Sequence, residues 1–325
     1  MHVAFYGAGS IAERHVDAIR RTGVLDISWV VSRAPEHARA FAEKKGIPRW
    51  TADEAGPLAD PEVGAVVVAY PTFRHAEVAL AAFATAKHVV CEKPLSDSVA
   101  SAEQMVAAAR AANRLLLVGQ LRRFWPVFAG MHELVASGRA GSLVRSTVDF
   151  QAEWDWSNRG WRVERPGGYL LDMHVHELDL LLWFANQEPR RVWATGENRA
   201  EREGTVVLEF PSSFARLDYC GRVSGRVYPA GSRTRYQLAF SNGRLEAEIA
   251  DSVTSETYIG GTKVAESRAA IGQETRAGWD GMWAAFAAAL TGSAPSPIAP
   301  EEALGNVRTA LAAANAMQTR AAQEL

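Results

Sequence analysis

The chain has 325 residues and a mass of 35.3 kDa, which is more than one ordinary hydrophobic core organises and predicts about two domains. Hydrophobic residues make up 48% of the sequence and charged residues 22%, values typical of globular proteins and unlike those of disordered or fibrous chains. Because 35 basic and 37 acidic side chains nearly cancel, neither nucleic acid nor an anionic membrane is an expected partner.

The cysteine content and the N-terminus bear on the compartment. Cys91 and Cys220 are too few for a disulfide framework and lack the spacing of a metal site, a pattern typical of a reducing environment. The chain opens directly on the strand-like stretch Met1–Tyr6, without a basic segment before an apolar one, and no run reaches about 18 apolar residues. The sequence therefore predicts a cytoplasmic protein without a membrane segment.

Residues 1–120 alternate short apolar runs with segments of helical period, the pattern of βαβ units around a parallel sheet. Buried strands are expected over Val3–Tyr6, Ile27–Val31, Ala65–Ala69, His88–Cys91 and Leu115–Val118. Helices are expected between them, over Ile11–Thr22, Pro35–Lys45, His75–Thr85 and Val99–Asn113. We predict an α/β Rossmann domain with a doubly wound parallel sheet, whose ligand crevice lies at the carboxyl ends of the strands.

Residues 121–325 follow a different pattern, because alternating segments are now separated by turns and not by helices. Antiparallel strands are expected over Val144–Glu153, Val192–Glu197, Val206–Phe210, Ala215–Gly221, Tyr236–Ser241 and Arg244–Ile249. Helices are expected over Phe124–Ser137, Gly168–Ala185 and Pro300–Ala322. This pattern predicts an α+β second domain.

A glycine-rich loop follows the first expected strand and opens the first expected helix. It reads Gly7-Ala-Gly9-Ser-Ile-Ala12, which fits the G-x-G-x-x-A fingerprint of dinucleotide binding in the context where that fingerprint has a mechanism. Gly7 permits the tight turn, Gly9 lets the backbone approach a pyrophosphate, and Ala12 lets the helix pack against the strand. Ser10 and Ile11 complete the predicted cofactor contacts at the helix N-terminus. The alternative is an ordinary glycine turn.

The residues after the second expected strand bear on the choice of cofactor. An NAD-binding fingerprint usually has an acidic residue there, which accepts hydrogen bonds from the ribose hydroxyls. This chain has Ser32 and Arg33 instead. A guanidinium and a hydroxyl favour the 2′-phosphate of NADP(H), so NADP(H) is preferred over NAD(H). The alternative is that Arg33 points into water, which leaves both cofactors possible.

Candidate reacting groups occur in both domains. Lys93 follows the His88–Cys91 strand, at the same edge as the glycine loop, where it could stabilise a developing alkoxide. Asp172 and His176 would share one face of a continuous helix at about 6 Å, with His176 as the base for a hydroxyl proton. Two alternatives stay open for the helix: a metal site with Asp179, or a core histidine with its partner.

Aromatic and guanidinium side chains are candidates for substrate contact. Flat rings and fork-shaped donors suit a sugar or polyol, whose carbons stack while its hydroxyls form hydrogen bonds. Loop tryptophans that pack against the domain, and arginines that only face solvent, are the alternatives. The predicted substrate-binding residues are Arg122, Arg123, Trp154, Trp161 and Arg162.

These motifs together resemble the Gfo/Idh/MocA oxidoreductase family, named for glucose-fructose oxidoreductase and inositol dehydrogenase. The resemblance runs through nearly the whole chain. It rests on Gly7–Ala12 with His15 behind it, Tyr70-Pro71-Thr-Phe-Arg-His75, Lys87-His-Val-Val-Cys-Glu-Lys-Pro94, Gly119–Arg123, and Gly167-Gly168 followed by Asp172, His176 and Asp179. Departures from the family pattern are Tyr70, Thr72, Leu121 and His174.

The resemblance implies hydride transfer between NAD(P) and a carbinol carbon of a sugar, inositol or related polyol. It implies that the second domain has a large open, mainly antiparallel sheet, often used for homodimer or homotetramer contacts. Lys93, Asp172 and His176 match the family's catalytic residues, without a metal, and the matching cofactor contacts include Tyr70, Pro71, His75, Glu92 and Lys93. The alternatives within the family are a non-catalytic NAD(P)-binding regulator and a redox-neutral, NAD-dependent glycoside hydrolase.

Overall fold

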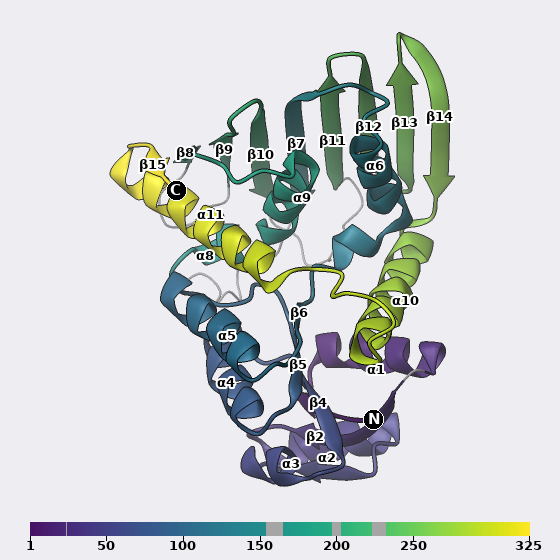
Figure 1. Cartoon of the computed structure of the whole chain (residues 1–325), viewed down its shortest axis with the longest axis vertical. Helices are drawn as coiled ribbons and strands as arrows, with labels where there is room; N and C mark the ends of the chain where they lie inside the picture. Colours follow the sequence, from purple (N-terminus) through teal and green to yellow (C-terminus); the bar gives the residue numbers. More distant parts are fainter. Residues whose placement is uncertain (24, 154–164, 197–202, 223–231) are drawn as a thin grey trace. The chain divides into compact units, whose positions relative to one another are not determined.

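The computed structural model describes residues 1–23, 25–153, 165–196, 203–222 and 232–325 (Figure 1). The chain separates into two compact units, each with a sheet of its own. The first contains Met1–Leu121 and Trp279–Val307, and the second contains Arg122–Gly278 and Arg308–Leu325. The segment Trp279–Val307 thus returns to the first unit from far along the sequence. No helix among the described residues combines the length and apolar character needed to span a bilayer.

The first unit contains a six-stranded parallel sheet in the order β3-β2-β1-β4-β5-β6. Its strands are β1 (His2–Tyr6), β2 (Asp26–Val31), β3 (Arg49–Thr51), β4 (Val63–Val68), β5 (His88–Cys91) and β6 (Leu116–Val118). The helices between them are α1 (Ser10–Thr22), α2 (Pro35–Lys45), α3 (Ala55–Ala59), α4 (His75–Ala84) and α5 (Val99–Ala111), with a 3-10 turn η1 (Thr72–Arg74). The predicted doubly wound Rossmann sheet is confirmed.

Burial explains why the central strands read as continuous apolar runs. The side chains of Val3–Tyr6 are completely buried, and in β4 the run Ala65–Val68 is as well. Helices on both faces remove both sets of alternating side chains from water; Figure 1 shows α4 and α5 on one side of the sheet and α1 on the other. Because the strands are parallel, they all end at one edge of the sheet. The loops that follow β1, β2, β4 and β5 lie at this edge.

The second unit contains a nine-stranded sheet in the order β14-β13-β12-β11-β7-β10-β9-β8-β15. Its strands are β7 (Leu143–Glu153), β8 (Arg191–Gly196), β9 (Glu203–Glu209), β10 (Phe214–Arg222), β11 (Arg233–Phe240), β12 (Gly243–Ile249), β13 (Val253–Ile259), β14 (Thr262–Ala269) and β15 (Gln323–Glu324). All neighbours are antiparallel except β7 and β10. The large, mainly antiparallel sheet implied by the family resemblance is therefore confirmed.

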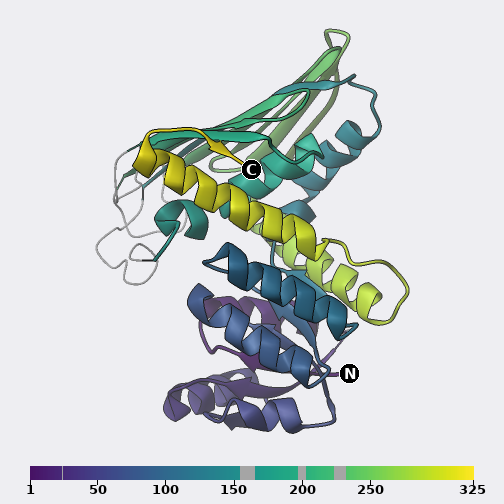
Figure 2. The same cartoon turned by 60° about the vertical axis from the view of Figure 1, so that its left-hand side comes forward.

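Helices α6 (Pro126–Ala136), α9 (Val175–Ala185) and α11 (Pro300–Thr319) lie along one face of this sheet, as Figure 2 shows. The second unit also contains α8 (Gly168–Asp172), the first part of α10 (Ile271–Leu290) and most of a short 3-10 segment η2 (Leu121–Phe124). The alternation in β7 matches this cover, because Ser146, Val148 and Phe150 are buried while Arg145 and Asp149 are exposed. In β7 the opposite face thus carries polar side chains.

The helix expected over Gly168–Ala185 is in fact two helices, so that prediction is wrong in its continuity. Helix α8 ends at Asp172 and α9 begins at Val175. His174 lies between them with φ −84° and ψ 1°, outside helical geometry. Its imidazole is buried against the rings of Phe150 and Tyr219, at centroid distances of 4.9 and 4.2 Å. Packing of this side chain accompanies the break.

Candidate functional site

Most of the predicted cofactor residues lie at the carboxyl edge of the parallel sheet. They follow the ends of four strands, so the topology brings them to the same side of the first unit. Gly7 follows β1, Ser32 and Arg33 follow β2, Tyr70 and Pro71 follow β4, and Glu92 and Lys93 follow β5.

Gly7 is required by the fold itself. Its backbone has φ +129°, which an L side chain rarely adopts, and a Cβ placed there would lie 2.6 Å from the carbonyl oxygen of Ala69. Its N–H donates to the carbonyl oxygen of Val31 at 2.9 Å. The tight turn predicted from the motif is therefore one in which the chain passes directly over the end of β4.

Gly9 is not required by protein packing. A Cβ added there would meet no atom within 4 Å, and its φ of −96° is ordinary for any residue. Gly9 is the N-cap of α1, and as a glycine it places no side chain over the amides of the first turn. Ile11, in that turn, is 40% exposed. The open backbone, the helix N-terminus and an exposed apolar side chain together fit a nucleotide pyrophosphate and its attached ring.

The loop after β2 presents an exposed cation. Ser32 is half-buried and its N–H donates to the carbonyl oxygen of Thr51 at 3.2 Å, while Arg33 is exposed. In the described part of the chain no carboxylate lies within ion-pair distance of Arg33. Its positive charge acts on the neighbouring Tyr70. This loop can therefore receive an anion without first breaking an ion pair.

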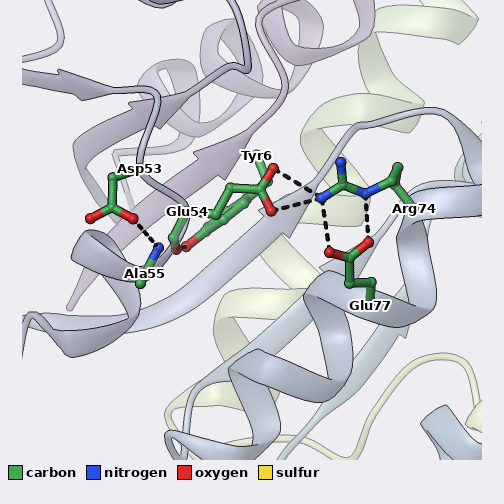
Figure 3. Close-up of polar contacts among 6 residues, drawn as sticks. All are labelled: Tyr6, Asp53, Glu54, Ala55, Arg74 and Glu77. Atoms are coloured by element: carbon green, nitrogen blue, oxygen red, sulfur yellow. Dashed lines mark hydrogen bonds and ion pairs between the residues drawn. The ribbon is translucent and has the colours of Figure 1, made fainter.

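A second guanidinium nearby, which the sequence analysis missed, is already neutralised. Figure 3 shows Arg74 between the carboxylates of Glu54 and Glu77, at 2.8 and 2.7 Å. The Tyr6 hydroxyl donates to the backbone carbonyl of Glu54 at 2.7 Å. Burial, and then the charge of Glu54, raise the pKa of Tyr6 and of Tyr70, so both phenols stay neutral. Only the i,i+3 spacing of Arg74 and Glu77 was visible in the sequence.

His75 links two loops of the predicted site and is itself inaccessible. It is 1% exposed, and its two ring nitrogens lie 2.9 Å from the carbonyl oxygens of Pro94 and Tyr70. Burial lowers the pKa of this imidazole, against the opposing effect of those two hydrogen bonds. We therefore revise its role from a cofactor contact to a bridge that fixes the loop after β4 to the loop after β5.

The second unit holds the other two predicted reacting groups. Asp172 is the last residue of α8, and His176 is the second residue of α9. Both side chains are partly exposed. The pair therefore flanks the break between two helices, in place of the single helical face that the i,i+4 spacing predicted.

The residue after His176 is a buried carboxylate that lies beside a guanidinium and an imidazole. Glu177 is fully buried and forms an ion pair with Arg122, which also donates to the Tyr236 hydroxyl. His174 approaches Glu177 at 3.6 Å. Burial alone would raise the pKa of Glu177, but the charge of Arg122 and then the proximity of His174 lower it to about 2. This network anchors the first turn of α9.

Arg122 and Arg123, predicted as substrate contacts, are both 6% exposed. Arg123 binds Asp179 in a bidentate ion pair at 2.7 and 2.9 Å, and its guanidinium lies 5.3 Å from the Trp183 ring centroid. Because buried charges need partners, we revise both arginines from substrate contacts to anchors that tie η2 to α9. The carboxylates they bind are 55 and 56 residues away in sequence.

The remaining predicted groups are the alternative metal ligand Asp179 and three substrate contacts. Asp179, the third member of the alternative metal site, is occupied by Arg123. Over the described ranges no cluster of His, Cys, Asp and Glu has an arrangement that could hold a metal ion. The predicted substrate contacts Trp154, Trp161 and Arg162 lie outside the described residues.

Two family models match the chain. One, described as an oxidoreductase family with an NAD-binding Rossmann fold, matches residues 1–120. The other, described as the GFO/IDH/MocA C-terminal domain, matches residues 128–246. Together they span most of both units.

Characterised relatives and solved structures agree with these matches. A 1,5-anhydro-D-fructose reductase of Ensifer adhaerens is 29% identical over 98% of this chain and 97% of its own. A myo-inositol 2-dehydrogenase of Thermotoga maritima is 28% identical over 80% of this chain and 78% of its own. The structure of GenD2 from gentamicin A biosynthesis, in complex with NAD, superposes with a TM-score of 0.85 at 24% identity, covering 100% of this chain and 96% of that one. This last likeness concerns the fold.

Proposed function

The chain belongs to the Gfo/Idh/MocA family of oxidoreductases, and from that premise we propose that it transfers a hydride between a nicotinamide dinucleotide and a CH–OH or C=O carbon of a sugar, inositol or related polyol. The observation that carries the proposal is the open backbone at Gly9, which protein packing does not explain. The relatives named for anhydrofructose reduction and inositol oxidation support the substrate class.

The residues that hold the cofactor in this proposal are those at the carboxyl edge of the first sheet. The backbone from Gly7 to Ala12 receives the pyrophosphate, and Ile11 contacts the nicotinamide end. Tyr70 and Pro71 border the same edge after β4. When bound, the nicotinamide supplies the hydride acceptor or donor.

We propose NADP(H) as the preferred cofactor. A 2′-phosphate would gain charge-assisted hydrogen bonds from Arg33 and Ser32, while no carboxylate in the described ranges already pairs with Arg33. Arg74 is less suited to this role, because Glu54 and Glu77 neutralise it. Loss of the Arg33 guanidinium would therefore weaken NADPH binding and leave NADH binding almost unchanged.

The proposed catalytic residues are Lys93, Asp172 and His176. In the oxidation direction His176 accepts the hydroxyl proton as the hydride leaves the same carbon. The Lys93 ammonium donates a hydrogen bond to that oxygen and stabilises its developing negative charge. Asp172 orients the imidazole or binds a neighbouring hydroxyl. In reduction the same proton returns by the reverse path.

The test combines cofactor titration with turnover. Fluorescence titration with NADH and NADPH gives the two dissociation constants, and a panel of polyols and keto-sugars then gives turnover with each cofactor. Lys93→Ala should lower kcat by about 100-fold or more, as loss of a group that stabilises transition-state charge does, while the cofactor Kd stays within about twofold. Lys44→Ala, which removes an exposed lysine on α2, is the control.

Three results would contradict the proposal. Wild-type turnover by Lys93→Ala would remove the lysine from the chemistry. A wild-type protein that binds the cofactor but turns over no substrate would favour a non-catalytic regulator. In that case Lys93→Ala and His176→Ala would both leave the cofactor affinity unchanged. A copurified cofactor that never exchanges while a glycoside is cleaved would favour the redox-neutral hydrolase.

We also propose that the protein is a homodimer or homotetramer that associates through the nine-stranded sheet. Two large apolar side chains support this, since Trp193 and Phe214 are 51% and 42% exposed. Neighbouring residues of a strand point to opposite faces of the sheet. Trp193 follows the buried Val192 on β8, and Phe214 precedes the buried Ala215 on β10. Both therefore point away from the helices.

A further inference from the structure

A buried carboxylate stands directly before Lys93. Glu92 is 9% exposed and both of its carboxylate oxygens are engaged. Oε1 lies 2.9 Å from Nε2 of His15 in α1, and Oε2 accepts the backbone N–H of Lys93 at 3.1 Å. One side chain thus joins the helix behind the glycine loop to the backbone of the proposed catalytic lysine.

His15 is held in an aromatic cage. It is fully buried, and its ring centroid lies 4.7 Å from that of Trp279, 5.5 Å from that of Trp283 and 6.3 Å from that of Phe5. The two tryptophans come from α10, in the segment that returns to the first unit. With apolar rings around it, His15 has Glu92 as its polar anchor and cannot swing away from it.

A glycine makes room for the carboxylate on its remaining side. A Cβ at Gly119 would lie 2.9 Å from Glu92 Oε1, closer than real Cβ contacts allow. The N–H of Gly119 donates to the carbonyl oxygen of Cys91 at 2.8 Å, which keeps the end of β6 beside the end of β5. Gly119 therefore serves the placement of Glu92.

The charges around this carboxylate favour its ionised form. Burial alone would raise the pKa of Glu92, but the hydrogen bond from His15, and after it the charge of Lys93, lower it. Burial raises the pKa of the adjacent Cys91 thiol, so that group stays neutral and adds no competing charge. Glu92 is consequently a fixed negative charge beside Lys93 at neutral pH.

We propose that the His15–Glu92 pair is the positioning device for Lys93: the bond to His15 fixes the carboxylate, and the carboxylate fixes the lysine backbone, so that the side chain is held in place for its role in hydride transfer. Glu92 is then a positioning residue and not a cofactor contact. This inference rests on the function proposed above for Lys93. It adds that the helix which starts at the cofactor loop is bonded to the loop that carries the proposed catalytic cation.

The test uses Glu92→Gln. Glutamine keeps the size of the side chain and can still accept from the Lys93 N–H, but it carries no charge. We expect a kcat at least about tenfold lower, since misplacing a catalytic group by about 1 Å can cost roughly 100-fold. We also expect the cofactor Kd to stay close to that of wild type, because the change acts on the placement of Lys93 and not on the glycine loop. Glu43→Gln, an exposed carboxylate on α2, is the control and should leave both unchanged.

A second variant displaces the carboxylate without removing its charge, and it covers the case in which Glu92→Gln does not fold. Gly119→Ala keeps every charge but displaces the Glu92 carboxylate, so kcat should fall here too while the cofactor Kd stays close to that of wild type. Wild-type kcat in folded Glu92→Gln, or in Gly119→Ala, would overturn the inference. A failure of the proposed function gives a different result: the wild-type protein would show no hydride transfer, or its turnover would be unchanged in Lys93→Ala.

Discussion

Two glycines of one loop are there for different physical reasons, and a matched pair of substitutions separates them. Gly9→Ala puts a methyl group into open space at an ordinary φ, so the melting temperature should not fall, while NAD(P)H affinity should drop by about tenfold or more if a pyrophosphate approaches that backbone. Thermal unfolding and fluorescence titration give the two quantities.

The control is Gly7→Ala, in which the new methyl group collides with the carbonyl of Ala69 at a φ of +129°. That variant should lose about 1–3 kcal/mol of unfolding free energy, whatever the ligand does. Unchanged cofactor affinity in Gly9→Ala would mean that nothing binds close to this backbone, which would remove the main support for the cofactor site.

The place of the candidate residues in the fold was predictable from sequence wherever they belong to a contiguous motif. The glycine loop and the residues around Lys93 follow strand ends, so topology alone sends them to one edge. The roles of Arg122, Arg123 and His75 were not predictable, because their partners are fixed by tertiary contacts. Solvent-facing and buried arginines look the same in a single sequence, and only Glu177 and Asp179 on α9 reveal which kind these are.

At the scale of the element, the break between α8 and α9 is the clearest difference from expectation. Nothing in Leu171–Glu177 is a strong helix breaker such as proline or glycine, so the apolar periodicity reads as one helix. The break coincides with His174, whose ring packs on the sheet and whose nitrogen approaches Glu177. Packing of one side chain outweighs the local preference of the segment, as tertiary context often does.

The first turn of α9 should make the second unit sensitive to acid through Glu177. The pKa of this carboxyl is lowered from 4.5 to about 2 in the folded protein, against the effect of burial and chiefly by the charge of Arg122. A lowered pKa adds stability that is present above about pH 4.5 and disappears as the pH falls toward 2. Between pH 5 and pH 3 wild type should lose about 2 kcal/mol of unfolding free energy through this group.

Urea unfolding of wild type and Glu177→Gln at several pH values tests this linkage. The variant should be less stable at neutral pH by about 3–5 kcal/mol, because Arg122 is left buried without its carboxylate, and the gap should narrow as the pH falls. Glu266→Gln, which removes an exposed carboxylate of β14, should track wild type throughout. A gap that stays constant from pH 5 to pH 3 would show that Glu177 does not titrate in this range.

At the scale of the whole molecule, the two fold classes were predictable and the full inventory of strands was not. The short strand β3 has only three residues, and β14 is exposed along almost its whole length, so neither shows the burial pattern that identifies a strand. The return of Trp279–Val307 to the first unit also lacks a local signal. The role of this segment becomes visible only in the structure, where the Trp279 and Trp283 rings enclose His15.

Association through the nine-stranded sheet is the prediction that concerns the assembled protein. Trp193 on β8 and Phe214 on β10 expose about half of their surface on the face turned away from the helices, and large exposed apolar side chains are typical of interfaces. Light scattering after size exclusion should give a dimer or tetramer for wild type and a smaller species for Trp193→Asp with Phe214→Asp. Trp50→Asp, which changes a tryptophan 41% exposed on β3 of the first unit, should keep the wild-type mass. A monomeric wild type, or equal masses in all three proteins, would contradict an interface on this face.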